Sequence, residues 1–251
     1  QRGKYFGLAL DIPYVVFIFS PDVTFFNEQA VLAHEKLEQV INAAFIKLGK
    51  KCIVWNSSRS TIVLCPIIPH PKTINKDTLY LAEEVKKDIS KSLPQLTVTV
   101  GIGTYHPDLL AIKNSYQEAC QAINTGRKVW GPNGIYHYNN LGIYHLLVKL
   151  SETDECLHFI ENTLGQLCHY DKKKNGALLL TLEQLLNTDS LRQIAKQLYI
   201  HPKTVAFRKN RIEEITGMNL DNPEHRLTLT IALKLHRLMN KGRNNFEINN
   251  A

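Results

Sequence analysis

The sequence predicts an α+β protein of two domains, an α/β sandwich followed by an all-helical domain. The chain has 251 residues, which exceeds the common size of a single domain. Strand and helix patterns alternate over residues 1–150, and only helical patterns follow from residue 151. A content of 44% hydrophobic and 21% charged residues argues against a disordered chain. We therefore expect domains over 1–150 and 151–240 and a disordered tail over 241–251.

The elements of the first domain follow from hydrophobic periodicity and turn residues. The polar residues Asn56–Ser60 lie between two strand patterns and predict a hairpin with a five-residue loop. Hairpins among helices predict a mixed, mainly antiparallel sheet. Gly49, Pro94 and a position near Gly126 mark the expected helix ends. The predicted strands are Tyr5–Leu10, Tyr14–Phe19, Cys52–Trp55, Thr61–Ile67 and Leu96–Ile102, and the predicted helices are Glu28–Leu48, Leu79–Leu93 and Leu109 to about Asn124.

The second domain is predicted from leucine-rich helical spacing. A helix around Leu157–Leu167 is expected to end at the polar, basic segment Tyr170–Gly176. A helix over Leu178–Leu186, two short helices and a long last helix, Pro223–Met239, are expected to follow.

Residues 190–215 have the pattern of a helix-turn-helix. Ser190, with Gln193 three residues later, forms a capping box and predicts a helix start. The small Ala195 allows a second helix to cross closely. Pro202 breaks the first helix, and Thr204 is the expected N-cap of the second.

Basic residues are concentrated in this segment. No acidic residue lies between Asp189 and Glu213, although the helical half as a whole is nearly balanced, with 14 basic and 12 acidic residues. Cations placed on phosphates release condensed counterions, which is the main source of sequence-independent DNA affinity. Basic runs alone often only make a helix surface soluble, so a solvated helical hairpin is the alternative. The six basic residues are Arg192, Lys196, Lys203, Arg208, Lys209 and Arg211.

A rotation of 100° per residue assigns faces to the second helix. Val205, Ile212 and Ile215 share the side expected to face the first helix, and Ala206 and Asn210 point the opposite way, with Phe207 and Glu214 beside them. The amide of Asn210 can read adenine, and Phe207 can touch a thymine methyl.

Other side chains of this segment are assigned to the DNA backbone or to the fold. Lys203 and Thr204 lie at the end that enters the major groove first. Lys209 and Arg211 flank the surface where phosphates would lie, and Arg208 faces inward, where a structural role is as reasonable as a phosphate contact. The candidate DNA-binding residues are Ser190, Arg192, Gln193, His201, Lys203, Thr204, Ala206, Phe207, Arg208, Lys209, Asn210 and Arg211.

The segment Leu178–Leu238 resembles the C-terminal helix-turn-helix of the PucR/CdaR transcription regulators. In that family the turn and second helix typically read H-x-N-T-x-x-Y-R, followed by an I-E-x-x-T-G block. Lys203 stands here in place of the usual Asn and Phe207 in place of the usual Tyr, which bears on base preference rather than on the binding mode. The matching residues are His201, Thr204, Arg208, Ile212, Glu213, Thr216 and Gly217.

The first half is similar to the GGDEF-like domain that precedes this helix-turn-helix in many such regulators. The similarity lies in Val100–Ile123 and Ile135–Leu147. The resemblance implies a bacterial regulator that binds double-stranded DNA as a homodimer under control of a small-molecule or nucleotide effector. Family members usually carry an N-terminal sensory module ahead of both domains, and we expect this chain, which starts at Gln1, to lack it.

GGDEF-type domains include diguanylate cyclases, which need metal-binding carboxylates and hairpin glycines. Asp11 could take one metal position, but Asn56–Thr61 contains neither glycine nor acid. Gly101 and Gly103 do not complete a dinucleotide fingerprint, and Gly101 is expected beside a helix. We expect a degenerate domain with no catalytic residue and no cofactor. The alternative function is a nucleotide-sensing or residual cyclase protein whose helical half is a protein-interaction module.

Cysteine usage predicts a cytoplasmic protein. Five cysteines without a CxxC pair are read as reduced thiols rather than a disulfide framework. Cys156 with His158 and Cys168 with His169 only loosely fit zinc spacing, so no metal site is expected. The longest apolar stretch, Ile12–Pro21, is about half of the ~20 residues that span a bilayer, so no membrane partner is expected.

Overall fold

The computed structural model describes residues 12–22, 28–57, 59–68, 70, 72–108, 111–174 and 176–248. The predicted strand Tyr5–Leu10 and the candidate metal ligand Asp11 lie outside these residues. Contacts divide the chain into two compact units between His145 and Leu146, whereas the boundary was expected at residue 150.

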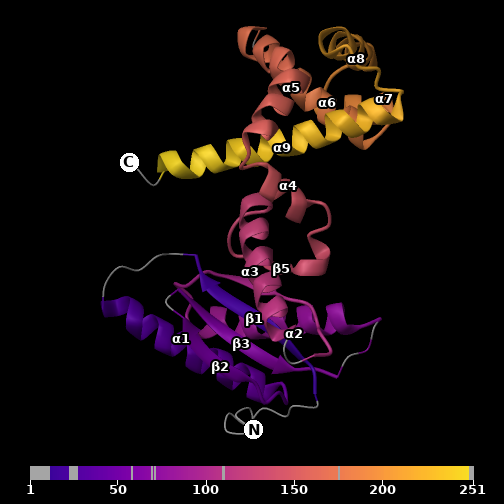
Figure 1. The fold of residues 1–251 in the computed structure, drawn as a ribbon. Coiled ribbons are helices and arrows are strands. Elements are labelled where there is room, and N and C mark those ends of the chain that lie inside the picture. The colour runs from indigo at the N-terminus through magenta and orange to yellow at the C-terminus, as the bar shows by residue number, and fades with distance from the viewer. Residues whose placement is uncertain are drawn as a thin grey trace. The chain divides into compact units, whose positions relative to one another are not determined.

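A five-stranded sheet in the order β2-β3-β1-β4-β5 forms the centre of the first unit (Figure 1). The β1–β3, β1–β4 and β2–β3 pairs are antiparallel, and only the β4–β5 pair is parallel. This confirms the predicted mixed, mainly antiparallel sheet. The strands are β1 (Tyr14–Pro21), β2 (Ile53–Ser57), β3 (Ser60–Pro66), β4 (Val98–Ile102) and β5 (Ile135–His137).

Helices cover both faces of this sheet, and the alternation of β1 shows which helix lies on which face. Phe17 and Phe19 pack in one core with Phe45 of α1 (Glu28–Lys47) and with α2 (Ile74–Ser92). Val16 and Ile18 point the other way, into a core with α3 (Ile112–Val129). The unit is therefore an α/β sandwich, as predicted. The short helices η3 (Tyr138–Asn140) and α4 (Tyr144–Leu150) follow β5.

Two glycines of the β4 region let α3 lie directly against the sheet. A Cβ atom at Gly101 would lie 2.2 Å from the carbonyl oxygen of Ala119, and one at Gly103 would lie 2.0 Å from that of Ser115. Gly101 thus has the position beside a helix that we expected. The close approach lets the Ser115 hydroxyl accept a hydrogen bond from the Val16 N–H at 3.0 Å.

Several boundaries of the first unit differ from the prediction. Ser57 pairs with Ser60, so the hairpin loop is shorter than the five residues expected. α2 begins at Ile74 rather than Leu79, and α3 runs past Gly126 to Val129. Gly126 is a packing position instead of a helix end, because a Cβ there would lie 2.1 Å from the Tyr136 ring.

Helices are the regular secondary structure of the second unit, and its described residues include no strand, which confirms the predicted class. Its helices are α5 (Asp154–Lys174), α6 (Leu178–Asn187), α7 (Leu191–Leu198), α8 (Pro202–Thr216) and α9 (Pro223–Ile248). Each of the five contributes side chains to one core, which includes Leu164, Leu182, Ile194, Ala195, Val205, Ile212 and Leu229. Among the described helices, none has both the length and the apolar composition needed to cross a membrane.

Two helix ends of this unit correct the prediction. α5 continues through Tyr170–Lys174, which we expected to be a break, and the Asp171 carboxylate accepts hydrogen bonds from the N–H groups of Leu178 and Leu179, each at 2.9 Å. A residue of α5 therefore caps α6. α9 extends to Ile248, through most of the segment expected as a disordered tail, and residues 249–251 lie outside the described part.

Candidate nucleic-acid interface

α7 begins where the capping box predicts. The Ser190 hydroxyl accepts a hydrogen bond from the Gln193 N–H at 3.4 Å. The reciprocal half is different, because the Gln193 amide oxygen accepts from the Thr188 hydroxyl and the Ser190 N–H donates to that same hydroxyl, each at 3.4 Å. Thr188 therefore accepts the hydrogen bond from the Ser190 N–H that the Gln193 side chain accepts in a regular capping box.

A left-handed residue, Tyr199, turns the chain from α7 to α8, with φ 55° and ψ 40°. The Ile200 N–H donates to the Ala195 carbonyl at 3.0 Å, and the Tyr199 N–H donates to that of Lys196 at 3.4 Å. These two bonds are those of a Schellman motif, which ends a helix abruptly. The break is therefore made at Tyr199, ahead of Pro202.

α8 is capped by His201, so the prediction of Thr204 as its N-cap is wrong. Pro202 is the first helical residue, a position that suits its fixed φ and missing N–H. The residue before a proline avoids helical geometry, and His201 is extended with ψ 145°. Its Nδ1 atom accepts a hydrogen bond from the Lys203 N–H at 3.1 Å.

The inner and outer faces of α8 are distinct. Val205 and Ile212 are buried, and Ile215 packs partly against the core that α7 shares, as the helical rotation predicts. The outer face is a stripe of exposed residues, Lys203, Phe207, Asn210 and Glu214, spaced four, three and four residues apart. Phe207 is 68% exposed, although a large aromatic side chain is usually buried. Ala206 is only half-exposed and lies to one side of the stripe.

Three of the six basic residues have partners within the unit. Lys209 pairs with Asp221 at 2.7 Å. Arg211 pairs with Glu214 at 2.7 Å and lies over the Tyr170 ring, with its guanidinium carbon 5.2 Å from the ring centroid. Arg208 donates to the Thr181 hydroxyl of α6 at 3.1 Å, which is the inward, structural position considered for it.

The other three cations, Arg192, Lys196 and Lys203, are exposed and form no ion pair or hydrogen bond through their side chains with the residues that the structure describes. Arg192 and Lys196 are four residues apart and so lie on one face of α7. Lys203 lies at the start of α8, where the partial positive charge of the helix dipole is also located. The positive charge that is available to a partner is therefore at α7 and the turn.

The candidate residues come together on α7, α8 and the residue before each helix. Lys196 and Tyr199 belong to the same surface but are absent from the predicted contacts. The four-residue spacing from Arg192 could have pointed to Lys196. The exposed candidates are Ser190, Arg192, Gln193, His201, Lys203, Phe207 and Asn210, and the half-buried ones are Thr204, Ala206, Arg208, Lys209 and Arg211.

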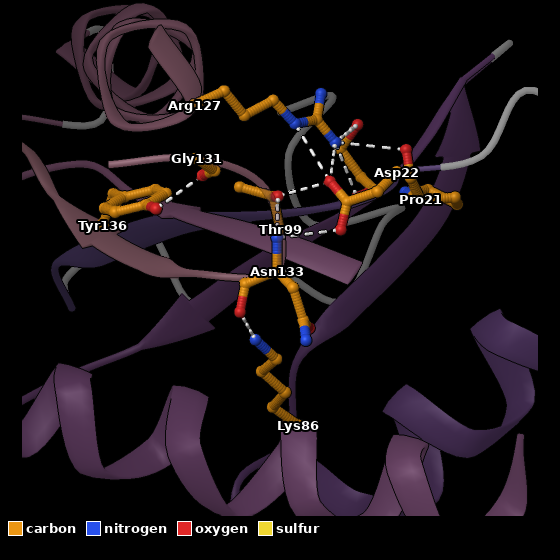
Figure 2. Close-up of polar contacts among 9 residues, drawn as sticks. Pro21, Asp22, Lys86, Thr99, Arg127, Gly131, Asn133 and Tyr136 are labelled. Atoms are coloured by element: carbon orange, nitrogen blue, oxygen red, sulfur yellow. Dashed lines mark hydrogen bonds and ion pairs between the residues drawn. The ribbon is translucent and has the colours of Figure 1, made fainter. Parts of the chain in front are cut away.

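In the first unit, the acid that follows β1 is Asp22, and it is already bound by other side chains (Figure 2). Its carboxylate accepts hydrogen bonds from Arg127 Nη2 at 2.8 Å and Nε at 3.1 Å, from the Thr99 hydroxyl, and from the Asn133 N–H at 3.0 Å. The side chain of Asp22 is 8% exposed. Three of these four hydrogen bonds end on Oδ1 and one on Oδ2, so most of the acceptor capacity of this carboxylate is already used within the fold.

The surroundings of Asp22 extend to α2. Lys86 donates to the Asn133 carbonyl, and burial lowers the pKa of its ammonium group, with the Asp22 charge opposing that shift (Figure 2). No group of three or more His, Cys, Asp or Glu side chains among the described residues could hold a metal ion.

Two family models match the chain. A model of the GGDEF-like domain matches residues 1–125, and a model of the PucR C-terminal helix-turn-helix domain matches residues 178–235. The helix-turn-helix match lies within the segment Leu178–Leu238 that carried the resemblance. The GGDEF-like match includes Val100–Ile123 but ends before Ile135–Leu147, the second segment of that resemblance.

Curated relatives match parts of the chain. The proline-responsive transcriptional activator PutR of Bacillus subtilis is 33% identical over 55% of this chain and 34% of its own length. The purine catabolism regulatory protein of Bacillus subtilis is 30% identical over 57% of this chain and 27% of its own length. The carbohydrate diacid regulator of Escherichia coli is 29% identical over 94% of this chain and 60% of its own length. The chain thus spans less than two thirds of each of these relatives.

Proposed function

Because this chain belongs to the PucR/CdaR type of regulator, with a GGDEF-like domain ahead of a PucR C-terminal helix-turn-helix domain, we propose that it regulates transcription by binding double-stranded DNA through α7 and α8. One observation carries the proposal. The exposed stripe of α8 begins at Lys203, and the neighbouring helix α7 has two more exposed cations, Arg192 and Lys196; none of the three has a side-chain partner within the described chain. Cations without a partner lose no ion pair when they bind phosphate.

In this proposal α8 is the recognition helix. Its N-terminal end, with Lys203, enters the major groove first. The Asn210 amide hydrogen-bonds an adenine edge, and the Phe207 ring contacts a thymine methyl. Glu214, at the far end of the stripe, repels phosphate and so keeps the contact on the first three turns of α8.

The remaining candidates have supporting roles. Arg192 and Lys196 of α7 bind backbone phosphates, together with the Ser190 and Gln193 side chains. Lys209 and Arg211 bind phosphate only after their ion pairs with Asp221 and Glu214 break, and both of these carboxylates are highly exposed. Arg208 holds α8 against α6.

The proposal includes a homodimer. A single helix-turn-helix buries little surface on DNA, and two linked half-sites raise affinity and specificity together. A metabolite or nucleotide is the proposed effector, in keeping with relatives whose names refer to proline, purine catabolism and carbohydrate diacids. The proposed location is the cytoplasm.

We propose no catalytic activity for the GGDEF-like domain. A cyclase needs two or more carboxylates around divalent metal, and the acid beside β1 is instead bound by Arg127. The hairpin loop has no acid or glycine to replace it. Incubation with GTP and Mg²⁺ or Mn²⁺, followed by chromatography, should give no cyclic product, and accumulation of one would support the alternative of a residual cyclase.

The DNA contact is tested by selecting bound fragments from the parent genome and measuring affinity against salt concentration. Lys203→Ala and Arg192→Ala should each weaken binding to all sequences and make the log–log salt slope shallower by roughly 0.9 for each lost phosphate contact. Asn210→Ala should instead relax discrimination at one base pair by roughly 1–3 kcal/mol. Lys174→Ala, an exposed cation on α5, is the matched control. Wild-type affinity and slope in both cation variants would overturn the proposal.

A further inference from the structure

Tyr199 has a backbone conformation that its residue type disfavours. Left-handed dihedrals bring the Cβ atom of an L-residue close to the following carbonyl, so helices that end this way usually place glycine, and sometimes asparagine, at that position. Among the described residues, the other non-glycine residue with positive φ is Asn133, one of the tolerant types. A tyrosine here destabilises the turn relative to glycine.

The tyrosine side chain adds no stabilising contact in return. It is 96% exposed, and its hydroxyl has no hydrogen-bond partner in the part of the chain that the structure describes. Other tyrosines of the molecule are used differently. The Tyr136 hydroxyl donates to the Gly131 carbonyl at 2.7 Å and its ring stacks on Trp130, while the Tyr170 ring lies under Arg211. Folding of this chain therefore does not account for the ring or the hydroxyl of Tyr199.

The position of Tyr199 suggests what the side chain contacts. It lies in the turn between Lys196 of α7 and Lys203 of α8, two cations assigned above to phosphates. The two Schellman hydrogen bonds hold its backbone, so the direction of the Cα–Cβ bond from which the phenol extends is set before DNA binds. Tyrosine is among the residues that donate hydrogen bonds to DNA phosphate oxygens.

We infer that Tyr199 binds the DNA backbone, donating a hydrogen bond from its phenol to a phosphate oxygen next to those bound by Lys196 and Lys203. The contact fixes the depth and angle at which the start of α8 enters the groove. It rests on the proposed function, since it needs DNA bound at α7 and α8. The turn is then less stable with tyrosine than with glycine, and the tyrosine side chain contributes to DNA binding instead.

Two substitutions separate the parts of this inference. Tyr199→Gly removes the side chain and relieves the backbone, so the Tm should rise while DNA affinity falls. Tyr199→Phe removes only the hydroxyl, so the Tm should stay the same while affinity falls by roughly threefold to tenfold. The loss should be equal for specific and non-specific duplexes, because a phosphate contact carries no sequence information.

The salt dependence distinguishes Tyr199 from its cationic neighbours. A neutral phenol releases no counterion, so Tyr199→Phe should lower affinity with an unchanged salt slope, whereas Lys203→Ala should make the slope shallower. Tyr80→Phe on α2, which also removes an exposed hydroxyl, should leave Tm and affinity unchanged.

Each possible outcome bears on one claim. If the wild-type chain binds DNA and Lys203→Ala weakens it, but both Tyr199 variants bind as the wild type does, the Tyr199 contact is overturned and the proposed function stands. If Tyr199→Gly weakens binding but Tyr199→Phe does not, the phosphate hydrogen bond is overturned. If Tyr199→Gly lowers the Tm, the side chain supports the fold, and the inference loses its premise. A wild-type chain that binds no duplex overturns the proposed function itself.

Discussion

At the scale of single residues, the Asp22 carboxylate accepts four hydrogen bonds, from Arg127, Thr99 and Asn133 (Figure 2). Asp22→Ala leaves the Arg127 guanidinium, which is two-thirds buried, without its counter-charge. We expect the free energy of unfolding of this unit to fall by about 2–4 kcal/mol, measured by urea denaturation. Asp88→Ala, which breaks the exposed pair with Lys47, should cost less than about 1 kcal/mol. Equal losses in the two variants would contradict the structural role of Asp22.

His137 makes the stability of the first unit depend on pH. It is 2% exposed, and burial lowers the pKa of its imidazole to about 4, with the Glu118 charge partly opposing the shift. Because the unfolded chain binds this proton near pH 6.5, the unfolded state holds more protons between the two values. The contribution of His137 to the free energy of unfolding is therefore fully present above pH 6.5. It is lost as the pH falls toward 4, which lowers the free energy of unfolding by up to about 3 kcal/mol.

The matched variant for this prediction is His137→Asn. The Nδ1 atom of His137 accepts a hydrogen bond from the Asn139 N–H at 3.1 Å, and an asparagine oxygen can accept the same bond without titrating. Denaturation curves from pH 7 to pH 4 should lose less stability in His137→Asn than in the wild type. Parallel losses would assign the acid sensitivity to other groups.

At the scale of elements, the start of α8 is the most informative, because two residues compete for the same cap. The imidazole of His201 accepts the Lys203 N–H, so His201→Ala should destabilise the second unit by about 0.5–2 kcal/mol. Thr204 lies inside the helix, and Thr204→Ala should be neutral or slightly stabilising because alanine is the better helix former. Thermal unfolding of the two variants decides between them, and the reverse order would restore Thr204 as the cap.

Elements with a regular apolar period were predictable, and those that depend on a distant partner were not. β1 and the leucine-rich helices follow from their own residues. β5 has three residues and exists because β4 pairs with it, which no local pattern records. Tyr170–Lys174 is polar enough to be read as a break, yet it stays helical while Asp171 caps the next helix. His201 was passed over because histidine is not a common cap.

The same limit applies to the site. The capped two-helix unit and its basic charge were visible in the sequence, and the inner face of α8 follows from its period. The ion pair of Lys209 and the stacking of Arg211 on Tyr170 were not visible, because Asp221 and Tyr170 lie outside the segment. The pair of Arg211 with Glu214 lies within the segment, at a three-residue spacing. The conformation of Tyr199 was equally hidden, since a left-handed turn is normally announced by glycine.

At the scale of the whole molecule, each unit has its own hydrophobic core. The cores of the first unit end at Ile123, and that of the second begins at Leu164. We expect calorimetry to show two unfolding transitions, with Asp22→Ala lowering one and His201→Ala lowering the other. A single transition that both variants shift would show that the two cores unfold as one cooperative body.

The place of β1 in the sheet has a consequence for synthesis on the ribosome. β1 is the earliest strand of the described chain, yet its neighbours β3 and β4 end at Pro66 and Ile102. One side of this mostly apolar strand therefore stays unpaired until more than thirty further residues have been translated. During that interval the nascent polypeptide exposes a strand edge that can pair with other chains. A chaperone bound to the nascent chain should therefore prevent most aggregation before β4 emerges from the ribosome.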